Sequence, residues 1–310
     1  MNLNGKGRAG RPSDPVIVTG SSTGLGLETA LHLAGAGFRV YATLRNTAQR
    51  DEVLQPAAER GVDLQVLRLD LTDQASIEEA VETVVGECGG VFGLVNNAGI
   101  GLRGCVEDCS DDEVREVFES NVFGTISVTR AVLPHMRAAG CGRVVTVSSV
   151  GGRVCGFGVS IYCASKFAQE GLGEGLALEL APFGIQSVLV EPGMINTTRW
   201  SRHRGTAQRA MDLDSPYHDL FWASEAIADR IVERSPTRPA DVAGAIHIAL
   251  TAEKPRTRYV VGRGAAAVIL LRRYLPQALF ERLYFGGHLR RIERRTNGVR
   301  QAPTVPAGHR

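Results

Sequence analysis

The strongest constraint on the fold is an alternation of strand-like and helical segments that runs through most of the chain. The strand-like segments are short, rich in β-branched residues and almost continuously apolar, which is typical of strands buried on both faces of a sheet. Amphipathic segments such as GLGLETALHLAGAG lie between them. Seven strand-like runs occur, at 16–20, 38–44, 64–70, 91–99, 142–149, 185–193 and 258–262. The alternation predicts an α/β fold, a doubly wound seven-stranded parallel sheet with helices on both faces.

The composition narrows the range of partners and compartments. The 310 residues carry a formal net charge of +2, which gives no case for nucleic acid as a partner. The longest apolar run near the C-terminus, residues 265–271, is far shorter than the roughly 20 residues of a membrane-spanning helix. The six cysteines match no zinc spacing, so we expect no metal site. Cys105 and Cys109 could pair, but free thiols in a cytoplasmic protein are the interpretation we favour, because the first 14 residues lack the apolar core of a signal peptide.

A glycine-rich turn follows the first strand in the run VIVTGSSTGLG. Gly20, Gly24 and Gly26 permit a sharp turn and a close approach of the backbone to a phosphate group. The helix that follows would present free N–H groups and the positive end of its dipole, with the hydroxyls of Ser22 and Thr23 nearby. Many strand-to-helix turns carry glycines, but this position after a first strand predicts a dinucleotide site.

The run YCASK contains a tyrosine and a lysine four positions apart, Tyr162 and Lys166. On a helix this spacing puts both side chains on one face. A free tyrosine has a pKa of about 10, and a nearby positive charge favours its phenolate. The pair could therefore be an acid–base device, although the spacing taken alone favours an exposed helix face.

Five motifs together resemble the short-chain dehydrogenase/reductase family. They are TGSSTGLG, NNAG at 96–99, SS at 148–149, YCASK at 162–166 and PG at 192–193, and their order and spacing match that family over roughly residues 15–262. The stretch SSVGGRVCGFGVSIYCASKFAQEGL, like VYATLR at 40–45, is most similar to the branch that holds 17β-hydroxysteroid and retinol dehydrogenases.

The resemblance implies a catalytic role for four residues. Tyr162 would donate or accept the proton of the substrate oxygen, and Lys166 would lower the pKa of Tyr162 and hold the nicotinamide ribose. Ser149 would bind the substrate oxygen, whereas Ser148 would be a strand-end hydroxyl bonded to backbone. Asn121, in ESNVFGT, would support a water that relays protons to Lys166.

The resemblance also implies a set of cofactor contacts at the strand ends and in the loops after them. Asp70 would bond the adenine amino group, although it could also be a turn carboxylate or a helix N-cap. The implied set is Gly20, Ser22, Thr23, Gly24, Leu25, Gly26, Arg45, Asp70, Leu71, Asn97, Ala98, Gly99, Tyr162, Lys166, Pro192, Gly193, Ile195 and Thr197.

The end of the second strand predicts NADP(H) rather than NAD(H) as the cofactor. An acidic residue there would bond the ribose hydroxyls and repel a 2′-phosphate. Leu44 occupies the expected acidic position, and Arg45 follows it. A guanidinium can bind a phosphate with two parallel hydrogen bonds. The alternative is that Arg45 is an ordinary solvated charge.

The predicted activity is that of an NADP(H)-dependent oxidoreductase that interconverts a ketone and a secondary alcohol, or an aldehyde and an alcohol. Residues 198–238 correspond to the substrate lid of the family and carry Trp200 and Trp222, so we expect a bulky apolar, steroid- or retinoid-like substrate. Packing of the lid on the core, or a subunit contact, would explain these aromatics equally well. Two alternatives remain: a ketoacyl- or polyketide-type ketoreductase, and a non-catalytic cofactor-sensing regulatory protein, which would be expected to lack the Tyr or the Lys.

The chain is expected to divide into a disordered leader at 1–14, a Rossmann-fold NADP-binding catalytic domain at 15–262, and a C-terminal helical extension with a basic tail at 263–310. The extension holds ten arginines against two glutamates. It could cap the substrate pocket, pair with another subunit or make peripheral contact with an anionic membrane. The last 15 residues are expected to be disordered. Two long helices, roughly 111–139 and 160–181, suggest a homodimer or homotetramer, as is common in the family.

Overall fold

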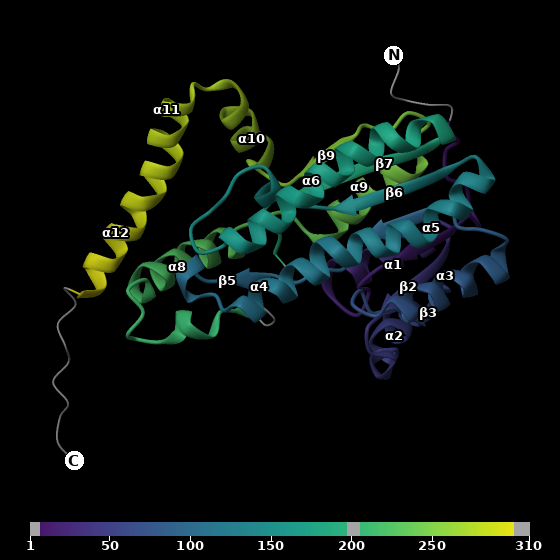
Figure 1. Cartoon of the computed structure of the whole chain (residues 1–310), viewed down its shortest axis with the longest axis horizontal. Helices are drawn as coiled ribbons and strands as arrows, with labels where there is room; N and C mark the ends of the chain where they lie inside the picture. Colours follow the sequence, from purple (N-terminus) through teal and green to yellow (C-terminus); the bar gives the residue numbers. More distant parts are fainter. Residues whose placement is uncertain (1–6, 197–204, 301–310) are drawn as a thin grey trace.

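A computed structural model describes residues 7–196 and 205–300. Its core is a seven-stranded parallel sheet in the order β3-β2-β1-β4-β6-β7-β9 (Figure 1). The strands are β1 (Pro15–Val18), β2 (Arg39–Leu44), β3 (Gln65–Arg68), β4 (Gly93–Asn96), β6 (Gly142–Val147), β7 (Ile185–Pro192) and β9 (Arg258–Val261). This arrangement confirms the predicted doubly wound fold.

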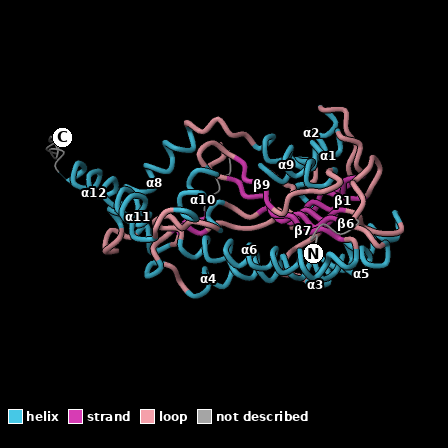
Figure 2. Tube along the Cα trace, turned by 90° about the horizontal axis from the view of Figure 1, so that it is seen from above, coloured by secondary structure: helices cyan, strands magenta, loops and turns pink. Residues whose placement is uncertain are grey.

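Helices cover both faces of the sheet (Figure 2). They are α1 (Gly24–Gly35), α2 (Asp51–Glu59), α3 (Gln74–Cys88), α5 (Thr125–Ala139), α6 (Ser160–Leu180) and α9 (Pro239–Thr251). Two further helices, α4 (Asp111–Phe118) and α8 (His218–Glu233), lie beyond the carboxyl edge of the sheet (Figure 1). Adjacent residues of β1 point to opposite faces. Val16 and Val18 lie in the core shared with α1 and α9, whereas Ile17 lies in the core shared with α3, α5 and α6.

The observed strands end earlier than the apolar pattern predicted. β4 stops at Asn96 and β6 at Val147, so most of NNAG and both serines of SS lie in the loops that follow. Both loops therefore lie at the carboxyl edge of the sheet. Asn97 bonds the glycine turn and Ser149 accepts from Gly151 in its own loop. The prediction that the Ser148 hydroxyl bonds backbone is wrong, since Ser148 Oγ has no hydrogen-bond partner among the described residues. A further two-stranded sheet, β5 (Leu102–Arg103) with β8 (Gly205–Thr206), joins this edge to the lid.

The leader differs from the prediction of disorder over residues 1–14. Arg8 makes two hydrogen bonds to the Asp14 carboxylate, at 2.6 and 2.7 Å, and its guanidinium lies 4.5 Å from the centre of the Phe92 ring. The Gly10 N–H donates to the Leu250 carbonyl oxygen at 2.9 Å. Residues 7–14 therefore pack on the sheet, because long-range partners hold a segment whose own composition favours disorder. Residues 1–6 lie outside the described part.

The predicted helix at 111–139 is interrupted. A π-helical segment, Glu119–Gly124, separates α4 from α5, and Asn121 lies within it. π-bulges are frequent at functional sites.

The C-terminal extension is helical as far as Arg300. It consists of α10 (Ala265–Tyr274), α11 (Gln277–Phe280), a π-helical turn (Glu281–Phe285) and α12 (Gly286–Arg300). It projects away from the sheet, and α12 packs against the lid helix α8 (Figure 1). The predicted disordered tail is thus helical over residues 296–300, and its remainder lies outside the described residues. No helix in the described ranges has the length and apolar character needed to cross a membrane.

Candidate functional site

The sheet order reverses beside β1, since β2 pairs with one edge of this strand and β4 with the other. In open α/β sheets, ligands bind at the carboxyl ends of the strands where the order reverses. The glycine-rich turn and the NNAG loop both lie at this point.

The glycine turn is shaped so tightly that side chains would not fit. Gly20 has φ +69°, and a Cβ there would lie 2.8 Å from Ala98 Cα. Gly24 also has a positive φ, +60°. A Cβ on Gly26 would overlap the Gly20 carbonyl oxygen and lie 2.5 Å from Asn97 Nδ2. The turn therefore requires glycine for close packing as well as for backbone freedom.

The NNAG loop is bonded directly to this turn. Asn97 Nδ2 donates to the carbonyl oxygens of Thr19 and Gly20, at 2.9 and 3.2 Å. Thr19 Oγ1 accepts from the N–H groups of Asn97 and Ala98, both at 3.0 Å. A Cβ on Gly99 would lie 2.8 Å from Asn121 Oδ1. The polar residues after β4 thus hold the cradle in shape.

The two residues at the end of β2 that could select between NADP(H) and NAD(H) differ in their exposure to solvent. Leu44 is only 1% exposed and belongs to the core, whereas Arg45 is exposed. A carboxylate at position 44 would therefore be buried in apolar surroundings, and Arg45 is the residue that can reach a ligand.

Asp70 and Leu71 follow β3. The Asp70 carboxylate accepts from the N–H and hydroxyl of Thr72, at 3.0 and 2.9 Å, so it is a turn carboxylate. The N-cap of α3 is Asp73 instead. Leu71 packs against the π-helical segment at Gly124.

Tyr162, Lys166 and Ser149 meet at the carboxyl end of β6. Lys166 Nζ lies 5.8 Å from the centre of the Tyr162 ring. A Cβ added to Gly151 would lie 3.3 Å from Ser149 Oγ and 3.4 Å from Tyr162 Cε1. Ser149 Oγ accepts from the Gly151 N–H at 2.9 Å, which fixes its orientation. The Ser149 hydroxyl and the Tyr162 ring therefore lie close together, and the Lys166 ammonium lies near the same ring.

Asn121 is completely buried and ties the π-helical segment to this group. Its Oδ1 accepts from the Ile100 N–H at 2.8 Å, and its Nδ2 donates to the Ile100 carbonyl at 2.8 Å and to Ser165 Oγ at 3.0 Å. Ser165 Oγ donates in turn to the Tyr162 carbonyl at 2.7 Å. Asn121 thus lies beside the helix that carries Tyr162 and Lys166.

A buried charge cluster lies beside the loop that carries Ser149. Glu191, on β7, is fully buried and pairs with Arg153 at 2.9 Å and with Arg258 at 3.0 Å. Burial and the neighbouring Glu170 carboxylate raise the pKa of Glu191 to about 7. The cluster joins β7, β9, α6 and the loop after β6.

The sequence after β7 reaches the same crevice. The Gly193 N–H donates to the Val261 carbonyl at 2.8 Å, which turns the chain away from Pro192. Ile195 packs against the core that contains α1 and α9. Thr197 lies outside the described residues.

Comparisons with known proteins agree with this geometry. Residues 14–208 match the family model for short-chain dehydrogenases. The chain belongs to the short-chain dehydrogenase family. It is therefore an oxidoreductase of a family that binds nicotinamide cofactors and acts on small molecules.

Named relatives confirm the branch suggested by the sequence. The chain is 37% identical over 251 residues to human 17-beta-hydroxysteroid dehydrogenase type 1, covering 79% of this chain and 76% of that one. It is 35% identical over 274 residues to mouse retinol dehydrogenase 5, covering 84% of each. A variant of the actinorhodin polyketide ketoreductase, solved with NADPH, shares 31% identity with a TM-score of 0.71, covering 82% of this chain and 97% of that one.

The crevice of this short-chain dehydrogenase fits a dinucleotide. Thr23, the residue before α1, makes no side-chain cap to the helix, and the first turn of α1 contains no acidic residue. A pyrophosphate placed there would meet the positive end of the helix dipole. No group of three or more His, Cys, Asp or Glu side chains in the described ranges could hold a metal ion.

The lid aromatics divide into packed and exposed groups. Phe221 is buried, and it packs against Gly158 on the loop that leads to α6. Trp222 is 38% exposed, with its ring 5.4 Å from that of Phe221. The buried ion pair between Arg103 and Glu225, at 2.7 Å, fastens the lid helix to β5. Trp200 lies outside the described residues.

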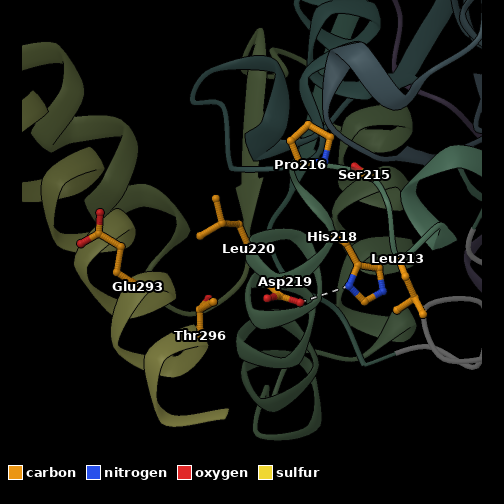
Figure 3. A pocket seen from close by; sticks show the side chains of 8 residues that line it. All are labelled: Leu213, Ser215, Pro216, His218, Asp219, Leu220, Glu293 and Thr296. Atoms are coloured by element: carbon orange, nitrogen blue, oxygen red, sulfur yellow. Dashed lines mark hydrogen bonds and ion pairs between the residues drawn. The ribbon is translucent and has the colours of Figure 1, made fainter. Parts of the chain in front are cut away.

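A cavity of about 410 Å³ lies between α8 and α12 (Figure 3). Asp219 and Leu220 face it from the lid helix, and Glu293 and Thr296 face it from the extension. Its lining includes neither Ser149 nor Tyr162, so we assign it to the contact between the lid and the extension.

Several residues near the site were not predicted from the sequence. Cys155 and Cys163 lie close together, and a hydrogen bond from the Cys163 thiol lowers the pKa of Cys155 to about 6. Burial, and to a smaller extent the charges of Cys163 and Cys155, raise the pKa of Tyr284 in the C-terminal extension. Gln169 contacts Lys166, and its position three residues later on the same helix face was the signal that could have revealed it.

Proposed function

We propose that the chain is an NADP(H)-dependent short-chain dehydrogenase that interconverts a ketone and a secondary alcohol on a bulky apolar substrate. The observation that carries the proposal is the proximity of Ser149, Tyr162 and Lys166 at the carboxyl edge of the sheet, the edge that also carries the glycine turn. When bound, the nicotinamide supplies or accepts the hydride.

The protein side of the reaction follows from the chemistry of these groups. The Ser149 hydroxyl binds the substrate oxygen, and Tyr162 transfers the proton to or from that oxygen. The Lys166 ammonium lowers the pKa of the phenol and thereby makes it a better acid. Gly20, Gly24, Gly26 and the residues of NNAG hold the dinucleotide backbone.

Tyr162→Phe tests this assignment, because the ring stays and only the proton carrier is lost. We expect kcat to fall by at least about a hundredfold while NADPH binding, measured by fluorescence titration, stays within twofold. A screen of steroids, retinoids and acyl ketones, followed by NADPH absorbance, supplies the substrate. Wild-type turnover by the variant would contradict the mechanism.

The choice of NADP(H) rests on Arg45, which is exposed after β2, and on the absence of an acidic residue at position 44. The choice of an apolar substrate rests on Trp222, an aromatic side chain that the lid leaves partly exposed. A polyketide-type ketoreductase is the second candidate, because the actinorhodin ketoreductase shares 31% identity and a TM-score of 0.71 with this chain. Faster reduction of acyl ketones than of steroids or retinoids would favour it.

We also propose a homodimer or homotetramer formed through α4, α5 and α6. Large apolar side chains are exposed on these helices and on the π-helical segment between α4 and α5, among them Phe123, Phe167 and Leu178. Light scattering at micromolar concentration tests this assembly, and a monomer would contradict it. The six free thiols support a cytoplasmic location.

The C-terminal extension supports a proposal of peripheral contact with an anionic membrane. Leu270, Leu271 and Tyr274 are exposed on α10, beside Arg272 and Arg273. Such a mixture of apolar and basic side chains suits a membrane surface. Sedimentation with anionic vesicles, but not with zwitterionic ones, is the expected result.

A further inference from the structure

A buried glutamine connects the candidate catalytic lysine to Asn121. Gln169 lies on α6 and is 1% exposed. Its Oε1 accepts from Lys166 Nζ at 2.9 Å. Its Nε2 donates to the Asn121 carbonyl at 2.6 Å and lies 3.2 Å from Thr125 Oγ1. One amide therefore bridges α6 and the π-helical segment beside it.

The chemistry of the two main partners fixes the orientation of this amide. An ammonium can only donate hydrogen bonds, so it must meet the oxygen of Gln169. A backbone carbonyl can only accept, so it must meet the NH₂ group. The opposite orientation would break both hydrogen bonds, and the bridge is therefore a defined structure.

The bridge matters because Lys166 is itself only 6% exposed. A buried ammonium is costly unless acceptors surround it. Lys166 Nζ donates to the Val147 carbonyl at 2.9 Å as well as to Gln169. Loss of the Gln169 acceptor would favour neutral Lys166 and release its side chain, and both effects would raise the pKa of Tyr162.

We propose that Gln169 is a positioning residue for the reaction, which holds the Lys166 ammonium against the Asn121 segment and thereby keeps Tyr162 acidic. This inference rests on the proposed function. In this proposal, Asn121 acts on Lys166 through the side chain of Gln169.

The first test needs no substrate or cofactor. The phenolate absorbance of the chain is titrated against pH, and the same titration of Tyr162→Phe is subtracted to isolate Tyr162 from the other five tyrosines. Gln169→Met keeps an unbranched side chain of similar size but removes the amide. We expect the pKa of Tyr162 to rise by about one unit, the size of a hydrogen bond to a charged group.

Two controls separate positioning from general packing. Gln186→Met makes the same change at another buried glutamine, on β7, whose side-chain atoms bond nothing in the described chain, and it should leave the Tyr162 pKa unchanged. In a Lys166→Met background, Gln169→Met should cause no further shift, because the effect passes through the ammonium. An unchanged Tyr162 pKa in Gln169→Met, or an equal shift without Lys166, would overturn the proposal.

A second variant and a second readout complete the test. If Gln169→Met does not fold, Gln169→Leu removes the same amide, and the Tyr162 pKa should again rise; no rise would overturn the proposal. The acid limb of the pH profile of kcat for alcohol oxidation should move to higher pH by as many units as the titration shows for the Tyr162 pKa. Failure to turn over any ketone or alcohol would refute the proposed function, whereas the titration would still decide the role of Gln169.

Discussion

Replacing Gly26 by alanine should damage the nucleotide cradle while leaving the sheet intact. The new methyl group would overlap the Gly20 carbonyl oxygen and lie 2.5 Å from Asn97 Nδ2. The overlap with a backbone carbonyl forces the glycine turn to shift, and the Asn97 side chain must move as well, so its hydrogen bonds to Thr19 and Gly20, at 2.9 and 3.2 Å, are lost.

The magnitude follows from these contacts. Two hydrogen bonds are worth about 1 kcal/mol each, and overpacking adds about 1–3 kcal/mol. The higher helix propensity of alanine returns about 1 kcal/mol. A net loss of about 2–4 kcal/mol is smaller than the roughly 5–15 kcal/mol that stabilises a typical protein, so the chain should fold with a displaced turn.

Urea unfolding and NADPH fluorescence titration together check this prediction. We expect a lower free energy of unfolding and at least a tenfold weaker affinity for NADPH, a change of about 1.4 kcal/mol in binding. The matched control is Gly35→Ala on the same helix, whose Cβ would approach nothing closer than Val62 Cγ1 at 3.6 Å. It should be neutral or stabilising by about 0.5–1 kcal/mol and should bind NADPH normally. If Gly26→Ala kept both its stability and its affinity, the close-packed cradle would not be the nucleotide site.

Three further predictions concern specificity, thiol reactivity and the lid. Arg45→Ala should weaken NADPH binding about tenfold or more and leave NADH binding unchanged, since only NADPH carries the phosphate that the guanidinium would bond. Arg60→Ala is the control variant. Equal losses of affinity for NADPH and NADH in Arg45→Ala would contradict the assignment. Iodoacetamide at pH 7 should label Cys155, whose pKa is lowered to about 6, well before Cys109, whose pKa burial raises to about 11; mass spectrometry reads the order, and the reverse order would refute it. Trp222→Ala should raise KM for bulky apolar ketones by tenfold or more and affect KM for small ketones little. The loss of roughly 100 Å² of apolar contact corresponds to about 2.5 kcal/mol of binding free energy. An equal effect on bulky and small ketones would indicate that the tryptophan only packs the lid.

The sequence alone predicted the parts of this protein that depend on short-range spacing. A period of two along β1 sends Val16 and Ile17 to opposite faces, and this pattern requires no knowledge of the partners. The spacing of Tyr162 and Lys166 likewise puts both on one face of α6. The glycines of the first turn could be recognised because only glycine tolerates such crowding at that place in the chain.

Features that depend on contacts between distant segments could not be predicted in this way. Burial of Leu44 is set by the elements packed over β2, so the sequence could name the position but not its exposure. Residues 7–14 are ordered by Phe92 and Leu250, although their own composition favours disorder. The interruption of the predicted helix around Asn121 is also a tertiary feature, since its side chain bonds Ile100 and Ser165.

The bridge at Gln169 illustrates the physical reason for this division. Its position on the helix follows from the sequence, but its partners come from segments that only folding brings together, since Asn121 lies 48 residues away. A buried amide must find a donor and an acceptor, and the tertiary structure alone decides which atoms those are. The sequence determined which residues share a helix face or a strand end, and the packing of the elements decided which of them meet at Lys166.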